Sequence, residues 1–452
     1  MNRKKHKTLK ILMLVSIAFY SQFTVSNTLK AQNGFNMPYS QFGIGSSELP
    51  FNMGMAARMG GAVYTRSANN YVNPFNPASY ATVELESFVF DMGLNIQVTN
   101  LRDGSGSLGD ADGNLGYLAL AMPVTKWWKL GAGLMPYTSV DYESVSQSTY
   151  MDSGMVKTVY DGTGGGSMVF VGSAFNIPAG KSRSFQVGFN VNYLTGSVER
   201  AISFDFQGND STYYLDSRRY RQTRLGNLTF DFGLQLRQQL GERYTLGLGL
   251  VYKPYRDMSV RDKALIYTYH ATDQSLVDTV FPAAGDDPEY RSRLEQAQTF
   301  GIGLSLERNK HWQLAFDATF ADWADMRYTE DSSHAVLGSS MACYGPYSRY
   351  ALGFEKMGNM DASSYWGRIS WSAGAHLTQG ALRLNLGGQE QRIDEWGVGT
   401  GITLPMRKGR SLLTLSLAYN SLGSSDILQR NAFTVGISVS SCERWFVKRK
   451  YN

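Results

Sequence analysis

Three residues of this 452-residue chain could together support nucleophilic chemistry: Ser370, Ser372 and His376. They fall on the same face of an alternating stretch, and a serine beside a histidine is the minimum arrangement for an activated nucleophile. No lipase or protease motif surrounds them, and serine is common on the inner faces of β-barrels. We therefore expect no catalytic residue and a protein that is not an enzyme.

Two other stretches could bind ions but lack the required spacing. Residues 110–114 read Asp-Ala-Asp-Gly-Asn, without the full spacing and closing glutamate of a calcium loop. Residues 161–167 are glycine-rich but carry no lysine at phosphate-loop spacing. The sequence predicts neither a metal site nor a cofactor.

The elements that would position such residues are stretches in which every second residue is apolar. One runs from Phe88 to Val98, another from Phe185 to Tyr193, and others surround Phe230 and Leu248. A period of two predicts β-strands with one apolar face, and runs of about ten residues match the span of a membrane strand. A soluble sandwich or propeller also alternates, but its strands are usually shorter.

The N-terminus predicts export. Basic residues precede a mostly apolar run over residues 11–23, and Leu29-Lys30-Ala31 is a plausible cleavage site. This pattern is typical of a secretory signal peptide over residues 1–31. No later stretch is long and apolar enough for a transmembrane helix.

The net charge of +5 largely reflects that leader. Residues 1–31 carry six of the 43 Lys and Arg and none of the 38 Asp and Glu, which leaves the remainder at −1. A nucleic-acid partner therefore has no support from charge. Two cysteines are too few for a disulfide framework.

Short turns alternate with longer polar connections along the chain. Residues 123–127 and 238–243 are examples of the first kind. Examples of the second kind are residues 99–113, 141–154, 207–222, 328–347 and 378–391. The fold class predicted is all-β: a transmembrane antiparallel β-barrel of about fourteen strands, over residues 85–442, in a Gram-negative outer membrane. Strand boundaries within 141–165 and 378–395 are not fixed by the pattern.

Residues 32–84 lack the strand rhythm. A barrel of this size has a lumen too wide for its own side chains to fill, so this segment is predicted to be a hatch that plugs it. Its Met53, Met55 and Met59 are candidates to line an apolar ligand site, because thioethers adapt to varied shapes. The alternative is that they pack the plug against the wall.

Four segments of the chain carry a family resemblance: Met-Gly-Gly-Ala at 59–62, Asn-Pro-Ala at 76–78, and the strand segments at 131–136 and 395–405. In these segments the chain resembles the FadL-like family of outer-membrane transporters of hydrophobic compounds. The resemblance implies a fourteen-stranded barrel with an N-terminal hatch, where ligands bind before leaving sideways near a kinked third strand. The hatch motif would comprise Asn73, Pro74, Asn76, Pro77 and Ala78.

The third strand contains Pro136 close to Gly131 and Gly133. Because proline cannot donate to a strand ladder, it requires a bulge, an edge or a gap. We expect these three residues to mark the lateral opening. The alternative is a tolerated proline near the end of strand pairing.

Four arginines cluster near the third outer loop: Arg218, Arg219, Arg221 and Arg224. We expect them to contact lipopolysaccharide phosphates through charge-assisted bonds, with solubilising loop charge as the alternative. Residues 443–452 form a basic tail on the periplasmic side. Cys343 and Cys442 are expected at opposite ends of the barrel and therefore unbridged.

The leading function is passive uptake of hydrophobic small molecules, of the fatty-acid or hydrocarbon class, across the outer membrane. The partners expected are outer-membrane lipid, lipopolysaccharide and the ligand. The alternative is a barrel that does not transport and serves as a subunit of an outer-membrane secretion or assembly complex, with other outer-membrane or periplasmic proteins as partners. No residue pattern identifies the ligand or the oligomeric state.

Overall fold

The computed structural model describes residues 37–444, except 48–49, 105, 151–153, 179, 181, 208–214, 271–274, 282–288, 325–327, 331–341, 387, 407–409 and 425–426. The expected signal peptide and the tail beyond residue 444 lie outside the described residues. Within the described part, no helix is long and apolar enough to cross a membrane.

Strands dominate the described residues, and the described helices have only three to six residues. The helices are η1 (Pro38–Gln41), α2 (Gly54–Ala57), η2 (Pro77–Thr82) and η4 (Trp366–Arg368). The strands are β1 (Ser87–Arg102), β2 (Ser107–Pro123), β3 (Trp128–Tyr150), β4 (Gly154–Pro178), β5 (Arg183–Gln207), β6 (Asp216–Leu240), β7 (Tyr244–Lys253), β8 (Arg256–Tyr269), β9 (Leu276–Val280), β10 (Glu289–Gln296), β11 (Thr299–Arg308), β12 (Trp312–Asp322), β13 (Tyr328–Glu330), β14 (Ala342–Tyr344), β15 (Pro346–Lys356), β16 (Ser370–Gln379), β17 (Leu382–Leu386), β18 (Gln389–Arg392), β19 (Glu395–Met406), β20 (Ser411–Ser424) and β21 (Leu428–Arg444).

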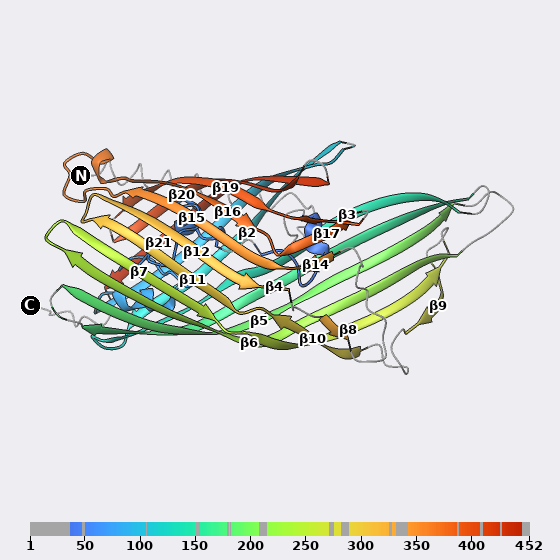
Figure 1. The fold of residues 1–452 in the computed structure, drawn as a ribbon, viewed down its shortest axis with the longest axis horizontal. Coiled ribbons are helices and arrows are strands. Elements are labelled where there is room, and N and C mark those ends of the chain that lie inside the picture. Colours follow the sequence, from blue (N-terminus) through green and yellow to red (C-terminus); the bar gives the residue numbers. More distant parts are fainter. Residues whose placement is uncertain are drawn as a thin grey trace, which may run out of the picture. The chain divides into compact units, whose positions relative to one another are not determined.

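These strands form a closed barrel of fourteen antiparallel strands, which confirms the predicted fold class. The first strand, β1, pairs with the last, β21, from Ser87↔Arg444 to Arg102↔Gln429. Three barrel strands are interrupted, so β7 with β8, β10 with β11, and β12 with β13 each form one strand. We call the end where β1 begins and β21 finishes the base, and the opposite end the mouth (Figure 1).

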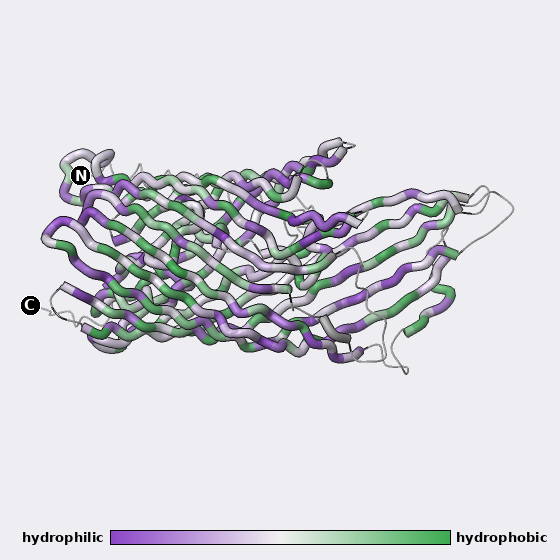
Figure 2. The backbone as a smooth tube through the Cα atoms, viewed as in Figure 1, coloured by the Kyte–Doolittle hydropathy of each residue, from purple (hydrophilic) through white to green (hydrophobic). Residues whose placement is uncertain are grey.

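The two faces of the wall are the reverse of those in a soluble protein. On β1, Leu94, Ile96 and Val98 are exposed on the outside, whereas Asn95 and Gln97 are buried on the inside. The alternation of hydrophobic and hydrophilic residues is visible along the strands in Figure 2. An apolar outer face and a polar lumen suit a barrel surrounded by lipid.

Several strands extend far past their neighbours toward the mouth (Figure 1). β4, β5 and β6 have 25 residues each, whereas β11 and β16 have 10. The loops expected at 99–113 and 141–154 are therefore wrong in large part, because β1–β2 and β3–β4 pair through most of them. Strands that leave the apolar band are wetted on both faces, so the ladder continues while the period of two disappears.

A second, small sheet lies within the connections expected at 328–347 and 378–391. β14 pairs with β17, and β17 pairs with β18. Leu384 of this sheet packs with Ile393 and with Tyr39 of the N-terminal part of the chain.

The main hydrophobic cluster lies between the N-terminal segment, residues 37–86, and the inward face of the barrel. Met53, Met55 and Tyr80 pack there with Tyr117 and Phe170 of the wall. Part of the hydrophobic core on the inward face of the wall thus comes from a segment that contributes no barrel strand.

Candidate functional site

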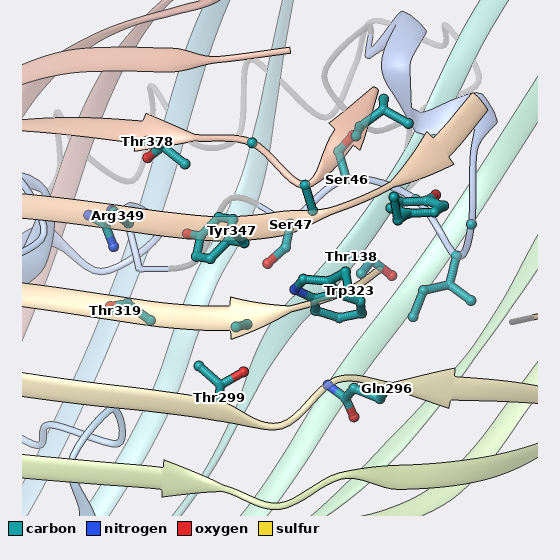
Figure 3. Close-up of a pocket in the computed structure, with 18 of the residues that line it drawn as sticks. Ser46, Ser47, Thr138, Gln296, Thr299, Thr319, Trp323, Tyr347, Arg349 and Thr378 are labelled. Atoms are coloured by element: carbon teal, nitrogen blue, oxygen red, sulfur yellow. The ribbon is translucent and has the colours of Figure 1, made fainter. Parts of the chain in front are cut away.

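A cavity of about 410 Å³ lies between the N-terminal segment and the mouth-side ends of the strands. Val63, Tyr64 and Phe75 line it from the N-terminal segment, and Met258 and Trp323 line it from the wall. Figure 3 shows that lining side chains come from β3 and from the mouth-side ends of β11, β12, β15 and β16. Small-molecule sites typically have volumes of about 300–1,000 Å³, so this space fits a compact ligand.

The far side of the cavity is covered by residues 37–47, which we call the strap. Phe42, Gly43 and Ile44 of the strap line the cavity. The Tyr39 hydroxyl donates to the Leu428 carbonyl oxygen at 2.5 Å. Burial raises the pKa of Tyr39 to about 12, so this hydroxyl stays protonated and keeps donating at any physiological pH.

The strap also binds the edge of β3 that faces β2. Ser46 and Ser139 exchange main-chain hydrogen bonds of 3.0 and 2.9 Å, and the Met37 N–H donates to the Asp141 carbonyl at 2.6 Å. On the opposite side, the Arg200 guanidinium donates to the Gly43 carbonyl at 2.7 Å. The strap is therefore fixed to both β3 and β5.

The residues of the predicted hatch motif shape the floor of the cavity. Asn73 donates through its amide to the Val63 and Arg66 carbonyls, both at 2.8 Å. The Asn76 amide donates to the Tyr64 carbonyl at 2.7 Å and to Leu234 O of β6 at 3.2 Å. These bonds hold the turn that carries Val63 and Tyr64, which is why asparagines are needed there.

Pro74, Pro77 and Ala78 complete that turn against the wall. The Pro74 carbonyl accepts from the Asn190 amide of β5 at 3.1 Å. The Asn76 oxygen accepts from the Ala78 N–H at 3.2 Å, which caps η2, and Pro77 is its first residue. Proline suits this position because its missing N–H would have no helical partner.

Buried charges fasten the N-terminal segment to β15. The Glu355 carboxylate accepts from Arg58 at 2.5 Å and from Arg66 at 2.7 Å, and all three side chains are at least nine-tenths buried. Burial alone would lower the pKa of Arg66, but the neighbouring Glu355 outweighs it and raises that pKa above its ordinary value. The Arg66 guanidinium therefore stays charged in the lumen.

A second carboxylate, Asp317 of β12, binds the turn below the cavity. It accepts from the Val63 N–H at 2.5 Å and from the Tyr64 N–H at 2.8 Å. Burial also raises the pKa of the Tyr64 hydroxyl, which shares a hydrogen bond of 2.8 Å with Thr319. Polar side chains of the wall thus bind both the main chain of this turn and the Tyr64 hydroxyl.

The methionines singled out in the sequence are all buried in packing. Met53 and Met55 belong to the main hydrophobic cluster, and Met59 contacts Ala315 and Ala351. None of the three lines the cavity described above. Met258 lines the cavity instead. The sequence feature that could have drawn attention to Met258 is Pro254, a proline within a predicted strand four residues earlier.

Pro136 lies where the β2–β3 ladder ends. Gly131 and Gly133 still pair with β2, and the last pair is Leu118↔Leu134. Beyond it, β3 continues to pair with β4, with an irregularity between Pro136 and Thr138. The three residues are thus together at an interrupted part of the wall, and their role as a lateral opening stays a prediction.

The four arginines do not form one patch. Arg218 pairs with Asp161 at 3.0 Å, and Arg221 pairs with Asp262 at 3.1 Å. Because side chains alternate between the two faces of a strand, these two arginines, three positions apart, lie on opposite faces of β6. Arg224 lies 3.7 Å from Glu289. Three of the four thus have acidic partners, and contact with lipopolysaccharide stays a prediction.

The serines and the histidine serve other contacts. Ser372 accepts from Arg58 at 3.1 Å and donates to the Gly401 carbonyl at 3.2 Å. Ser370 accepts from the Gly358 N–H at 2.9 Å. The His376 ring lies 4.4 Å from the Phe51 ring and 3.7 Å from the Glu395 carboxylate.

The chain matches one family model and several solved structures. A family model described as BamG matches residues 13–452. The monoaromatic hydrocarbon channel CymD is 14% identical, with a TM-score of 0.51 and coverage of 89% of this chain and 98% of that one. The toluene transporter TodX of Pseudomonas putida is 14% identical, with a TM-score of 0.54 and coverage of 87% and 98%. A FadL homologue of Pseudomonas aeruginosa is 12% identical, with a TM-score of 0.53 and coverage of 91% and 100%. No curated protein matches the chain.

Proposed function

The chain belongs to the BamG family, and from this membership and its FadL-like fold we propose that it is an outer-membrane channel for passive uptake of hydrophobic small molecules. The single observation that carries the proposal is the cavity of about 410 Å³ lined by strap, floor and wall. The solved structures of this fold include channels for monoaromatic hydrocarbons and toluene.

In this proposal the N-terminal segment is the hatch. It fills the lumen and is tied to the wall by Glu355 and Asp317, so a hydrophilic solute has no open path. The base faces the periplasm and the mouth faces outward, as in a barrel inserted after removal of a signal peptide. A hydrophobic ligand reaches the cavity from the mouth and leaves through the wall rather than past the hatch.

The finer proposal places a lateral opening above the β2–β3 ladder, at Pro136. Replacing Pro136 with valine restores a main-chain donor and is expected to slow uptake in an otherwise folded barrel. Unchanged uptake by Pro136→Val would remove the main support for an opening there.

A size substitution tests the proposed function directly. Ala321 lines the cavity, whereas Ala373 lies exposed on the outer face of β16. Ala321→Trp fills the cavity, and Ala373→Trp adds the same bulk facing lipid. Uptake of radiolabelled toluene and oleate is measured in cells that carry each variant or no barrel. Loss of uptake in Ala321→Trp alone supports the channel, and wild-type uptake no faster than in cells without the barrel refutes it.

A second candidate function is a subunit of an outer-membrane secretion or assembly complex. The observation in its favour is the connection between β15 and β16 at the base, where Trp366 is 74% exposed beside Tyr365. Exposed aromatic side chains are enriched at protein interfaces. Tagged protein purified in mild detergent distinguishes the two functions, because a stoichiometric partner lost in Trp366→Ala favours the complex and a lone barrel does not.

A further inference from the structure

The barrel wall is interrupted a second time, between β6 and the junction of β7 with β8. Phe232↔Tyr252 is the last β6–β7 pair, and Arg224↔Arg261 is the next pair toward the mouth. No ladder pair joins residues 225–231 to residues 253–260, and the structure describes every one of these residues. We call this interruption the β6–β8 seam.

A proline lies within the seam. Pro254 stands between the end of β7 and the start of β8, and it has no N–H to donate to β6. The outer edges of both strands remain paired, because β6 pairs with β5 through Asp231↔Asn190 and β8 pairs with β10 through Arg256↔Gln296. On the edge that faces β10 and β11, only Pro254 and Tyr255 have no ladder partner, so the long interruption lies on the edge that faces β6.

Side chains replace the missing ladder. Three contacts cross the seam: the Asn227 amide donates to the Ser259 carbonyl at 2.9 Å, the Arg256 guanidinium lies 4.4 Å from the Phe230 ring centroid, and Lys253 Nζ lies 3.9 Å from Asp231 Oδ2. Such contacts are individually weak and separate one at a time. A continuous ladder would have to break several main-chain hydrogen bonds together.

The cavity lies directly behind the seam. Leu225, Met258, Val260 and Leu294 are buried in one apolar cluster, and Met258 and Leu294 also line the cavity. Met258 belongs to the unpaired stretch itself, so its side chain is what separates the cavity from the seam. A methionine has three rotatable bonds and adapts to an arriving apolar group.

The two interruptions of the wall are closed in different ways. At β2–β3, the strap forms main-chain bonds with the free edge of β3 at Ser139 and Asp141. At the β6–β8 seam, only side chains bridge the two strands. The seam is the place where the wall opens without displacing the strap.

The seam begins at the mouth-side boundary of the apolar band. Leu246, Leu250 and Tyr252 are exposed on the outer face of β7, and Tyr255 follows at 52% exposed. The next outward residue of β8, Asp257, is charged. Aromatic girdles mark the membrane boundary in such barrels, so the seam opens toward the outer leaflet.

We propose that the β6–β8 seam is a lateral port, through which a hydrophobic molecule passes between the cavity and the outer leaflet as Met258 moves aside. This inference rests on the proposed uptake function and adds a route for it. The port requires the side-chain contacts across the seam to separate and the strap to stay in place.

The test is a reversible cross-link across the seam. Cys343 and Cys442 are first replaced by serine, and Asn227→Cys with Ser259→Cys is then bridged by a bifunctional, reducible thiol reagent. The matched control bridges Val187→Cys to Leu234→Cys, which face each other in the continuous β5–β6 ladder. Uptake of radiolabelled toluene and oleate is measured before bridging, after it, and after reduction. Heat-modifiable mobility in gels verifies that each barrel is folded.

We expect the seam cross-link to slow uptake, reduction to restore the original rate, and the control cross-link to leave the rate unchanged. Uptake that survives the seam cross-link overturns the port and leaves the proposed function standing. Loss of uptake with both cross-links also counts against the port, because rigidity anywhere in the wall would then suffice. No uptake by the serine-substituted parent overturns the proposed function and the port together.

Met258 offers a second measurement that needs no cross-link. Met258→Ala removes the side chain behind the seam and is expected to speed uptake, whereas Met258→Trp is expected to slow it. Equal rates for the two variants, in folded barrels, would contradict the port.

Discussion

Glu355 is the residue whose replacement should most weaken the attachment of the N-terminal segment. Its carboxylate is shared by Arg58 and Arg66, and the exposed fractions of the three side chains are 8%, 5% and 2%. Glu355→Gln keeps the volume and removes the charge. Two guanidinium groups then remain in the lumen without the anion that compensated them.

The magnitude follows from the cost of an uncompensated buried charge. Breaking a buried ion pair by removing one partner costs about 3–5 kcal/mol of stability, and here one change deprives two cations of their partner. The matched control is Glu307→Gln, whose ion pair with Arg237 has the same kind of partners but side chains 18% and 29% exposed. Exposed pairs contribute about 0–1 kcal/mol, so the control should lose no more than about 1 kcal/mol.

The assay is urea unfolding of the barrel refolded into lipid vesicles, followed by tryptophan fluorescence. A free energy of unfolding that falls by less than about 1 kcal/mol in Glu355→Gln would refute the reasoning. Proteolysis of the N-terminal segment in the folded barrel provides a second readout, which should increase in Glu355→Gln and not in the control.

Three further outcomes follow from the geometry. Asn76→Ala leaves two carbonyls and the end of η2 without their partner and should lower the unfolding free energy by about 1–3 kcal/mol in the same assay. Gly60→Ala should greatly reduce the amount of heat-modifiable barrel, because Gly60 has φ +62° and a Cβ there would lie 2.4 Å from the backbone of the wall. In the control Gly104→Ala, the added Cβ meets nothing within 4 Å, so the amount of folded barrel should not change. Intact-mass analysis under non-reducing conditions should find Cys343 and Cys442 as free thiols, as the structure has them, and a bridge between them would contradict the barrel topology.

The barrel could be predicted from the sequence because lipid imposes a rule on every strand that crosses it. The rule is that every second residue of such a strand is apolar, and the sequence around Phe88 and Phe230 follows it. The turn predicted at 123–127 connects β2 to β3 as expected. The rule ends where the membrane ends. The strand from Gly154 onward carries polar residues on both faces and therefore looks like a loop in the sequence, although its ladder with β3 is unbroken from Gly154↔Tyr150 to Gly166↔Thr138.

The site could be predicted only in part, for a related reason. Asn73 and Asn76 stand out because they bind main chain close by in sequence. Glu355 does not stand out, because it is one glutamate in an ordinary strand, and its partners Arg58 and Arg66 lie 297 and 289 residues away. The sequence shows a proline at position 254, but it does not show which neighbouring strand faces that proline. The seam could therefore not be predicted from the sequence.

The separation between the N-terminal segment and its anchors also fixes an order of assembly. The segment emerges first during synthesis, yet the acceptors of its two arginines belong to β15, and Gly60 packs on β16. Contacts between residues so distant in sequence form late, since the loop between them must close first. Until β15 is in place, Arg58 and Arg66 lack the carboxylate that pairs with both of them, so the N-terminal segment is fixed only late in assembly. The segment that precedes the barrel in the chain is thus fastened last, and its attachment to β15 can serve as a marker of a completed wall.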